Sequence, residues 1–368
     1  MTKQEIYPRR PTRFRDWWYH KKSQFYASEW VQDISARLPL LSRISRKEGE
    51  AIFQLMSGFV DTQILLAFVR TGALDKLRER PKSISQLASL IGIDVEAARV
   101  LCGAGQALGL VSVRNDQVSI ARRGILILTL PGISELIDHH SVLYSDLQDP
   151  VTFFNGQSER QLAHFWPYVF GAKNGLDAAD VSRYSDLMTK SQRMVAHDTL
   201  DAITLPKSGT WLDVGGGSGA FVSEVLRRQN SINASVFDLP GSNSASGAHG
   251  FIPGSFFEDD LPSGFDVISL IRVLYDHSDD SIIKLLTKIY NALPKNGRLI
   301  VSEPMLGQNS PNRWGDTYFA VYTMAMNTGK TRSAIKIAEI MKEIGFSNIK
   351  IHRSKRPYVT QVIECSKK

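Results

Sequence analysis

Apolar residues along this chain follow two different patterns. Over residues 48–77 they recur at helical spacing but on more than one face, which predicts one or two helices. Polar residues interrupt the stretch 52–69, so we expect a buried helix and not a membrane span. Its several apolar faces favour a dimer interface. After residue 205, short apolar runs alternate with helical patterns, which is typical of an α/β protein with a doubly wound sheet.

A winged helix is predicted between these two parts. A capped helix over 83–92, a second helix over 94–108 and a hairpin over 109–121 follow one another in that order. Winged helices most often bind DNA, but the second helix carries a single basic residue, Arg99, whereas a groove-reading helix needs several Arg, Lys, Asn or Gln. We therefore expect a packing or dimerisation role and no nucleic-acid partner, although arginines in the wing leave phosphate contact open.

Residues 131–205 are predicted to form a mostly helical layer that is rich in aromatic side chains. Such a layer could wall an apolar substrate pocket beside a cofactor domain, and it could equally be core. His139 and His140 lie in this layer, and we expect both to be packing residues. No Cys/His/Asp spacing here suggests a metal site.

A glycine-rich turn opens the C-terminal half and is followed by a predicted helix. Glycines allow a tight turn and let a ligand approach backbone N–H groups. The second strand ends in an acid about twenty residues later, which suits a carboxylate that accepts hydrogen bonds from a ribose diol. A nucleoside-containing cofactor is therefore predicted at Asp213, Gly215, Gly217, Gly219 and Asp238.

Two cofactors fit this turn. With Ala220 as the last position, the turn also matches the dinucleotide fingerprint G-x-G-x-x-G/A of NAD enzymes. The carboxylate of Asp213 would repel a pyrophosphate and attract an ammonium or a sulfonium. S-adenosylmethionine carries both cations and no phosphate, so we predict S-adenosylmethionine over NAD.

Polar residues also follow the other predicted strands of this half. In an open parallel sheet, the ligand lies outside the carboxyl ends of the strands. Asp213, Asp238, Glu303 and the segment 275–277 all come at such ends. We expect them to converge on one crevice.

Charge is concentrated at the N-terminus. Of a net charge of +7, residues 1–50 contribute 11 Lys/Arg against 6 Asp/Glu, interleaved with aromatic residues. Such a segment can be a solvated arm, or it can bind a membrane interface or nucleic acid. The two cysteines, Cys102 and Cys365, are far apart and predict a reducing compartment without disulfides. The polar start shows no signal peptide, so we expect a cytoplasmic protein.

Several motifs resemble the small-molecule O-methyltransferases related to the caffeate and hydroxyindole methylases. They occur in the family's order at 212–219, 237–240, 274–279, 293–297 and 301–304. The basic arm and the stretches 53–66, 165–172 and 272–277 are similar to a narrower group, the bacterial carotenoid methylases of the hydroxyneurosporene (demethylspheroidene) type. The resemblance covers residues 45–365. It implies a C-terminal Rossmann-like class I methyltransferase domain and an N-terminal, mostly helical winged-helix domain that dimerises.

Cofactor contacts carry over residue by residue. The family's adenine-binding acid is Ser255 here, its first supporting glutamate matches Glu303, and its second is Thr331. The family's general-base histidine is replaced by Tyr275, so a histidine-base mechanism does not carry over. The resemblance implies cofactor binding by Asp213, Gly215, Gly217, Gly219, Asp238, Leu239, Ser255, Phe256 and Arg272.

The implied substrate explains the loss of the histidine. A phenol has a pKa near ~10, but the tertiary 1-hydroxyl of an acyclic hydroxycarotenoid is far less acidic and must lose its proton late. We predict that Tyr275 orients this hydroxyl, that Glu303 or His277 accepts the proton, and that alignment supplies much of the rate. The alternatives are another apolar or aromatic acceptor, such as a tetrapyrrole, and a winged-helix DNA-binding regulator.

The expected organisation has three parts. These are a basic aromatic arm (1–45), a winged-helix dimerisation and substrate-wall domain (46–200) and a cofactor-binding methyltransferase domain (201–368). A long apolar carotenoid lives in the bilayer, so we expect the arm to contact the inner, photosynthetic membrane peripherally through anionic headgroups. The expected assembly is a homodimer.

Overall fold

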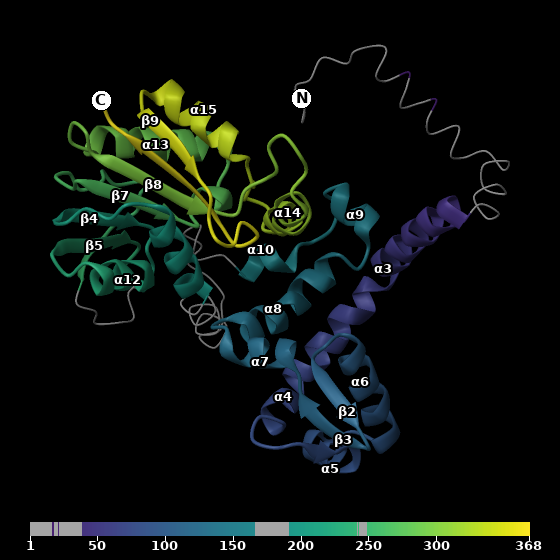
Figure 1. Ribbon diagram of the computed structural model, residues 1–368. Helices are drawn as coiled ribbons and strands as arrows, with labels where there is room; N and C mark the ends of the chain where they lie inside the picture. The colour runs from purple at the N-terminus through teal and green to yellow at the C-terminus, as the bar shows by residue number, and fades with distance from the viewer. Residues whose placement is uncertain (1–16, 18–20, 22–38, 166–190, 241, 243–248) are drawn as a thin grey trace.

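The computed structural model describes residues 17, 21, 39–165, 191–240, 242 and 249–368. The arm predicted over 1–45 lies almost entirely outside the described residues, and so does most of the stretch 165–172. A C-terminal mixed sheet covered by helices is joined to an N-terminal, mostly helical part (Figure 1). This confirms the predicted fold class.

Seven strands form the C-terminal sheet in the order β6-β5-β4-β7-β8-β10-β9. The first five are parallel, and β10 runs antiparallel to β8 and β9. The chain order reverses between β4 and β7, so a ligand crevice is expected outside their carboxyl ends. The strands are β4 (Gly209–Val214), β5 (Ile232–Asp238), β6 (Gly250–Pro253), β7 (Val267–Ile271), β8 (Arg298–Glu303), β9 (Ser347–His352) and β10 (Gln361–Ser366).

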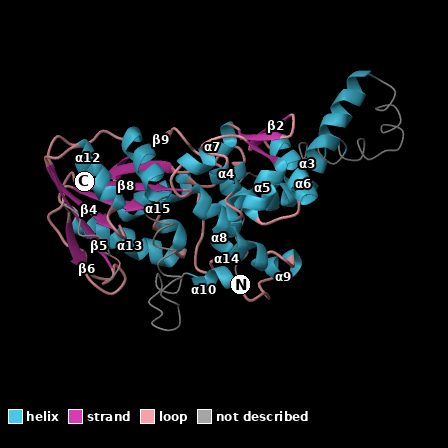
Figure 2. Ribbon diagram, turned by 90° about the horizontal axis from the view of Figure 1, so that it is seen from below, coloured by secondary structure: helices cyan, strands magenta, loops and turns pink. Residues whose placement is uncertain are grey.

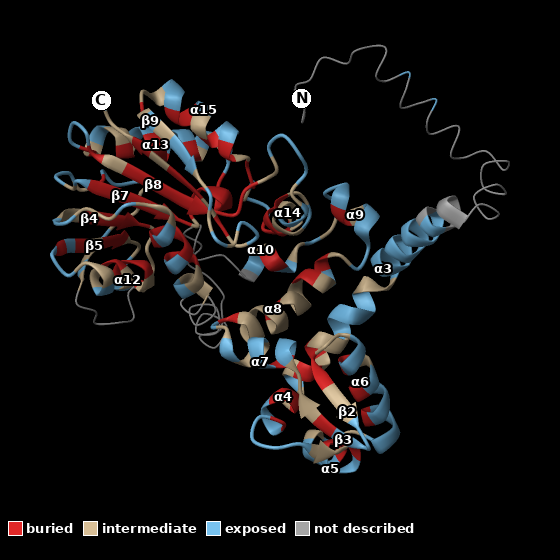
Figure 3. Cartoon of the chain, viewed as in Figure 1, coloured by how far each residue is buried: buried red, intermediate tan, exposed pale blue. Residues whose placement is uncertain are grey.

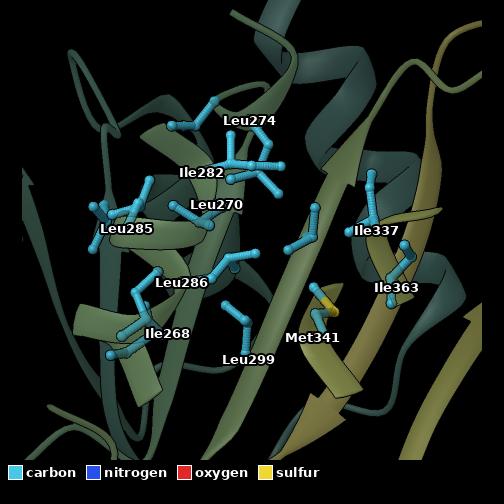
Figure 4. Packing of buried hydrophobic residues seen from close by; sticks show 14 of the residues in the cluster. Ile268, Leu270, Leu274, Ile282, Leu285, Leu286, Leu299, Ile337, Met341 and Ile363 are labelled. Carbon is cyan, nitrogen blue, oxygen red and sulfur yellow. The ribbon is translucent and has the colours of Figure 1, made fainter. Parts of the chain in front are cut away.

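Helices cover both faces of this sheet, as its buried strands require. On one face, α12 (Ala220–Arg228) and the helical residues 191–202 share an apolar core with β4 and β5. On the other face, α13 (Asp279–Ala292) and α15 (Ala334–Ile344) pack on β7, β8 and β10 (Figure 4). The sheet is therefore doubly wound.

Two segments of the C-terminal half differ from the pattern read from the sequence. The last strand starts at Gln361 and not at Tyr358, because Tyr358 lies in a turn that the Val359 N–H closes onto the Arg356 carbonyl. The helix expected after β8 begins as a π-helical turn, η3 (Trp314–Phe319), and continues as α14 (Ala320–Ala325).

The N-terminal half contains the predicted winged-helix elements. A three-stranded sheet, in the order β1-β3-β2, packs with two helices on one apolar core. Ser83 forms a capping box with Gln86 at the start of the first helix, and Asn115 and Asp116 adopt positive φ of 48° and 62° in the hairpin. The elements are α4 (Ala73–Lys76), β1 (Lys82–Ser83), α5 (Ile84–Ile91), α6 (Val95–Ala107), β2 (Val111–Arg114), β3 (Gln117–Ile120) and α7 (Arg122–Thr129).

The long apolar helix is exposed, which corrects the expectation that it is buried. It is a single helix, α3 (Pro39–Arg70), and most of its length stands away from the rest of the chain (Figure 3). Only its last turns, with Leu66 and Phe68, reach the winged-helix core. Its stretch Ser45–Arg70 is the one helix, among the described residues, that is long and apolar enough to cross a membrane by length and composition. A single chain leaves this face uncovered.

A helical layer lies between the winged helix and the sheet (Figure 2). Its core includes Leu143, Phe153, Leu162 and Tyr322. The buried carboxylate of Asp146 accepts from the N–H groups of Gln161 and Leu162, the first residues of the layer's third helix, and so fixes the turn that leads into that helix. The layer consists of α8 (Ile133–Asp146), α9 (Pro150–Phe154), α10 (Gln161–Phe165) and α14.

Two glycines of α6 allow a matched test of how tightly α3 packs on the winged helix. A Cβ at Gly105 would lie 2.4 Å from the buried Phe68 ring, whereas a Cβ at Gly103 meets nothing within 4 Å. We expect Gly105→Ala to lower the free energy of unfolding by about 1–3 kcal/mol through overpacking. Gly103→Ala should raise it by up to about 1 kcal/mol through helix propensity. Denaturant unfolding measures both, and equal effects would contradict this packing.

Candidate functional site

The turn between β4 and α12 needs glycine at three positions. Gly215, Gly217 and Gly219 have φ of 72°, 55° and 77°, a region that L side chains rarely adopt. The Gly215 N–H donates to the Phe237 carbonyl at 2.8 Å, which ties the turn to the end of β5. A Cβ at Gly217 would meet nothing within 4 Å, so open space adjoins its backbone. The turn is a cradle of bare peptide groups.

The carboxylate of Asp213 is fully buried beside this turn. Its Oδ1 accepts from the Ser269 hydroxyl at 2.6 Å, which in turn accepts from the Trp211 indole at 2.9 Å. Its Oδ2 has no hydrogen-bond partner in the described part of the chain. Burial raises the pKa of Asp213 to about 7, although the Ser269 hydrogen bond opposes the rise. A buried, unpartnered carboxylate oxygen suits an ammonium and would repel a phosphate, so these residues fit S-adenosylmethionine.

Asp238 ends β5 and faces the same turn. Its Oδ2 accepts from the Gly217 N–H at 2.7 Å, and its Oδ1 accepts from the Leu239 N–H at 2.6 Å. Burial raises the pKa of Asp238, while these two N–H groups act in the opposite direction. The carboxylate is thus fixed beside the glycine turn, and its remaining lone pairs can accept from a ribose diol.

Three aromatic rings form a wall beside the glycine turn; we call Phe256, Phe257 and His277 the aromatic wall. The His277 ring meets Phe256 and Phe257 edge to face, at centroid distances of 5.5 and 5.0 Å. Phe256 also lies 3.8 Å from where a Cβ on Gly215 would stand. Burial, and next the charge of Arg332, lower the pKa of His277 to about 4. A flat adenine can pack against such a wall.

Ser255 is held within its own turn. Its hydroxyl accepts from the N–H groups of Phe257 and Glu258 at 3.3 and 3.4 Å, and its own N–H donates to Asp259. These contacts shape the segment that carries Phe256. A contact between Ser255 and adenine stays a prediction.

The segment 272–276, which we call the reactive turn, follows β7. Arg272 has φ 61°, a left-handed conformation that is uncommon outside glycine, and its N–H donates to the Ser302 carbonyl at 2.8 Å. Its guanidinium donates to the Ser191 hydroxyl at 2.9 Å. The next residue, Val273, lies 2.9 Å from where a Cβ on Gly215 would stand, so the reactive turn packs on the glycine turn.

Tyr275 and Glu303 meet at the end of β8. Burial raises the pKa of the Tyr275 phenol, as does Asp276 beside it, while Arg272 opposes the rise through its charge and a hydrogen bond. The Tyr275 N–H donates to Glu303 Oε2 at 3.1 Å. Glu303 Oε1 and Asp276 Oδ1 are buried without a hydrogen-bond partner among the described residues. Burial raises the pKa of Glu303 to about 7.

Arg332 holds the reactive turn, although no sequence motif pointed to it. Only 2% of this side chain is exposed. Its guanidinium donates to the carbonyls of Leu274 and His277 at 3.0 and 2.7 Å and to the carboxylate of Asp279 at 2.6 Å. The neighbouring Thr331, at the family's second glutamate position, instead pairs with the Thr323 hydroxyl at 3.1 Å. The sequence does carry a cue to this role: a basic residue, Arg332, directly follows the threonine that replaces the family's second glutamate.

The predicted site residues therefore fall into two adjoining groups. Asp213, Asp238, Leu239 and the three glycines form the first, with the aromatic wall beside them. Arg272, Tyr275 and Glu303 form the second. His277 lies with the aromatic wall, through its ring contacts. Ser278, just after it, caps α13 by accepting from the Ser281 N–H.

Comparison with known proteins shows the family of this chain. The model of the O-methyltransferase domain matches residues 144–347. Demethylspheroidene O-methyltransferase of Rhodobacter capsulatus is 44% identical over 344 residues, which is 92% of this chain and 88% of the relative. The same enzyme of Cereibacter sphaeroides is 44% identical over 91% of this chain and 92% of its own length.

Solved structures share the fold. The pyocyanin biosynthetic protein PhzM has a TM-score of 0.74 at 19% identity, covering 88% of this chain and 99% of its own. Human N-acetylserotonin methyltransferase in complex with S-adenosylmethionine has a TM-score of 0.72 at 20% identity, covering 87% of this chain and 97% of its own. Fold, family match and the predicted cofactor agree with one another. The chain therefore belongs to the family of S-adenosylmethionine-dependent O-methyltransferases.

Proposed function

We propose that this protein methylates the tertiary 1-hydroxyl of an acyclic hydroxycarotenoid of the hydroxyneurosporene or demethylspheroidene type. The observation that carries the proposal is 44% identity, over about nine tenths of the chain, to two demethylspheroidene O-methyltransferases. The aromatic helical layer beside the reactive turn offers apolar side chains to such a substrate. Another apolar or aromatic acceptor, such as a tetrapyrrole, is the second candidate.

The residues of this chain bind and orient the reactants. S-adenosylmethionine supplies a methyl group on a sulfonium: the hydroxyl oxygen forms the new C–O bond and the electron pair of the C–S bond stays on sulfur. Asp213 would hold the ammonium of the cofactor, and Asp238 would accept from its ribose diol. The phenol of Tyr275, which burial keeps protonated, holds the substrate hydroxyl in line.

Glu303 and His277 remain our predictions for the proton acceptor. Glu303 has one free oxygen, and burial raises its pKa to about 7, but its other oxygen holds the backbone of the reactive turn. His277 is neutral at pH 7 because its pKa is lowered to about 4, but its ring packs in the aromatic wall. The placement of Glu303 supports it better than that of His277 does.

Homodimerisation and membrane contact are further parts of the proposal. Exposed apolar side chains line α3, among them Phe53, Leu55, Met56 and Phe59. Contiguous exposed apolar surface is costly in water and marks an interface. We propose that two copies cover it together, in a cytoplasmic protein whose basic arm touches the inner membrane peripherally.

Cofactor choice is tested by calorimetry with S-adenosylhomocysteine and NAD. We expect S-adenosylhomocysteine to bind and NAD not to bind. Asp238→Asn should weaken S-adenosylhomocysteine at least about tenfold, because a charge-assisted hydrogen bond is lost. Asp260→Asn, on an exposed residue of the loop after β6, is the control and should bind as the wild type does. Equal binding by the two variants would contradict the role of Asp238.

Substrate and orientation are tested by methyl transfer to 1-hydroxylated carotenoids. We expect the wild type to turn over, and Tyr275→Phe to lower kcat about 10- to 100-fold because the hydroxyl loses its alignment. Affinity for S-adenosylhomocysteine should not change. Tyr290→Phe, a tyrosine that packs on Phe346, serves as control. Cofactor binding without carotenoid turnover would retain the methyltransferase and exclude the carotenoid.

The role of α3 is tested with a charge on its exposed face. We expect Phe59→Glu to convert a dimer into a monomer in sedimentation, because the charge would be buried in the interface. Gln54→Glu adds the same charge at an exposed polar position on the opposite side of the helix and should leave the dimer intact. Binding of the wild type to anionic vesicles should weaken at high salt. A monomeric wild type would contradict the dimer, and no vesicle binding at low salt would contradict the membrane contact.

A further inference from the structure

Two histidine–tyrosine pairs join α8 to the helix that follows β8. His139 Nε2 lies 2.8 Å from the Tyr322 hydroxyl, and His140 Nε2 lies 2.7 Å from the Tyr318 hydroxyl. The paired residues are 183 and 178 positions apart in the chain. The helices that carry them lie side by side in both views (Figures 1 and 2). Both histidines therefore make specific polar contacts in addition to the packing expected of them.

The two pairs differ in exposure. His139 and Tyr322 are 8% and 6% exposed, and Tyr322 belongs to the core of the helical layer. His140 and Tyr318 are half-buried, and Tyr318 lies at the edge of that core. The pair of His140 and Tyr318 therefore combines a short hydrogen bond with partly exposed side chains.

Tyr318 lies close to the reactive turn. The helix that continues from it meets this turn at Gly329, where a Cβ would lie 2.8 Å from the Tyr275 carbonyl oxygen and 3.0 Å from Cβ of Thr323. Burial raises the pKa of the Tyr318 phenol, Tyr275 raises it further, and Arg272 opposes the rise. Tyr318 belongs to the π-helical turn η3, a conformation that is frequent at functional sites. A Cβ on Gly315 in this turn would lie 2.0 Å from the Met305 carbonyl oxygen, so η3 packs in close contact with the segment that follows β8.

The protonation states suit a proton relay. Burial lowers the pKa of His140, so its imidazole is neutral at pH 7. The raised pKa of Tyr318 keeps its phenol protonated. A neutral imidazole with its proton on Nδ1 accepts at Nε2, so the phenol donates to it. The phenol oxygen still has lone pairs, which can accept from a substrate hydroxyl.

We propose that Tyr318 contacts the substrate hydroxyl and, with His140 behind it, carries away the proton released by methyl transfer. This rests on the proposed O-methyl transfer and deepens it. The hydroxyl oxygen donates an electron pair to the methyl carbon and becomes positively charged. Its O–H pair then returns to that oxygen as the proton passes to Tyr318, whose own proton passes to His140 Nε2. The products are a neutral methyl ether and an imidazolium.

A weak base is sufficient for this order of events. Before methyl transfer, a tertiary alcohol is too weakly acidic for any side chain of this site to ionise. After it, the oxygen is that of a protonated ether, a dialkyl oxonium, and is strongly acidic, so the acceptor only needs to be unprotonated and near. A histidine whose pKa is lowered by burial meets that condition at every working pH near 7. The absence of a histidine at position 275 is thereby accounted for.

The test compares the two pairs. We expect His140→Gln and Tyr318→Phe each to lower kcat with a 1-hydroxylated carotenoid about 100-fold, while KM and the affinity for S-adenosylhomocysteine stay within about threefold. The double variant should be no slower than the slower single variant, because both residues serve one relay. His139→Gln and Tyr322→Phe, the matched buried pair, should lower the melting temperature but keep kcat within about threefold of the wild type.

Nuclear magnetic resonance gives a readout apart from turnover. The nitrogen signals of His140 can be assigned among the eight histidines by their loss in His140→Gln. The proposal requires an unprotonated Nε2 and a protonated Nδ1 at pH 7, and a change at Nε2 in Tyr318→Phe. A protonated Nε2 would reverse the hydrogen bond and overturn the relay.

Other outcomes separate this proposal from the proposed function. Full turnover by His140→Gln, or an equal loss in His139→Gln, would overturn the relay while the methyl transfer stands. A kcat that rises with pH around 7 and is flattened in Glu303→Gln would assign the proton to Glu303 instead. A wild type that binds S-adenosylhomocysteine but methylates no carotenoid would instead remove the substrate on which the relay rests.

Discussion

Buried carboxylates at the carboxyl ends of the parallel strands constrain the rest of the site. Asp213 and Glu303 lie on either side of β7, both fully buried, and burial raises the pKa of each to about 7. A carboxylate removed from water is costly unless it is paired. Each therefore depends on a donor: the Ser269 hydroxyl for Asp213 and the Tyr275 N–H for Glu303. The glycine turn and the reactive turn are folded around these acids.

The buried guanidinium of Arg332 connects the reactive turn to the segment that follows α14. Arg332 donates to the Leu274 carbonyl of the reactive turn, to the His277 carbonyl just after it and to the carboxylate of Asp279, which opens α13. A guanidinium presents five donors in a fixed plane, so it can hold several acceptors at once. These hydrogen bonds hold the reactive turn in place, although position 275 carries a tyrosine and not the family's histidine. Glu303 Oε1 is left without a hydrogen-bond partner among the described residues.

The helical layer supplies what the sheet edge lacks. The reactive turn provides a phenol, a guanidinium and one carboxylate, but the imidazole that follows it, His277, packs in the aromatic wall. Neutral imidazoles come instead from α8, through tyrosines of the segment after β8. Since a tertiary alcohol loses its proton only after its oxygen gains the methyl group, an acceptor need not be strong. It needs to be unprotonated and close: burial lowers the pKa of His140, and the 2.7 Å contact with Tyr318 places it next to the phenol.

The sequence by itself determined the features that depend on neighbours in the chain. Strand, acid, glycine turn and second acid follow one another within thirty residues, so Asp213, Gly217 and Asp238 were predictable, as were the caps and hairpin of the winged helix. Such motifs form from local hydrogen bonds and φ preferences, which residue types alone dictate.

Tertiary structure decided the contacts between distant segments. Whether α3 is covered depends on which surfaces meet it, and hydrophobic spacing is the same for a core helix and an exposed one. The hydrogen bond from Arg332 to Leu274 of the reactive turn joins residues 58 positions apart, and the pairing of His140 with Tyr318 joins residues 178 positions apart. No spacing rule relates such residues, because only the packing of layers brings their side chains within hydrogen-bond distance.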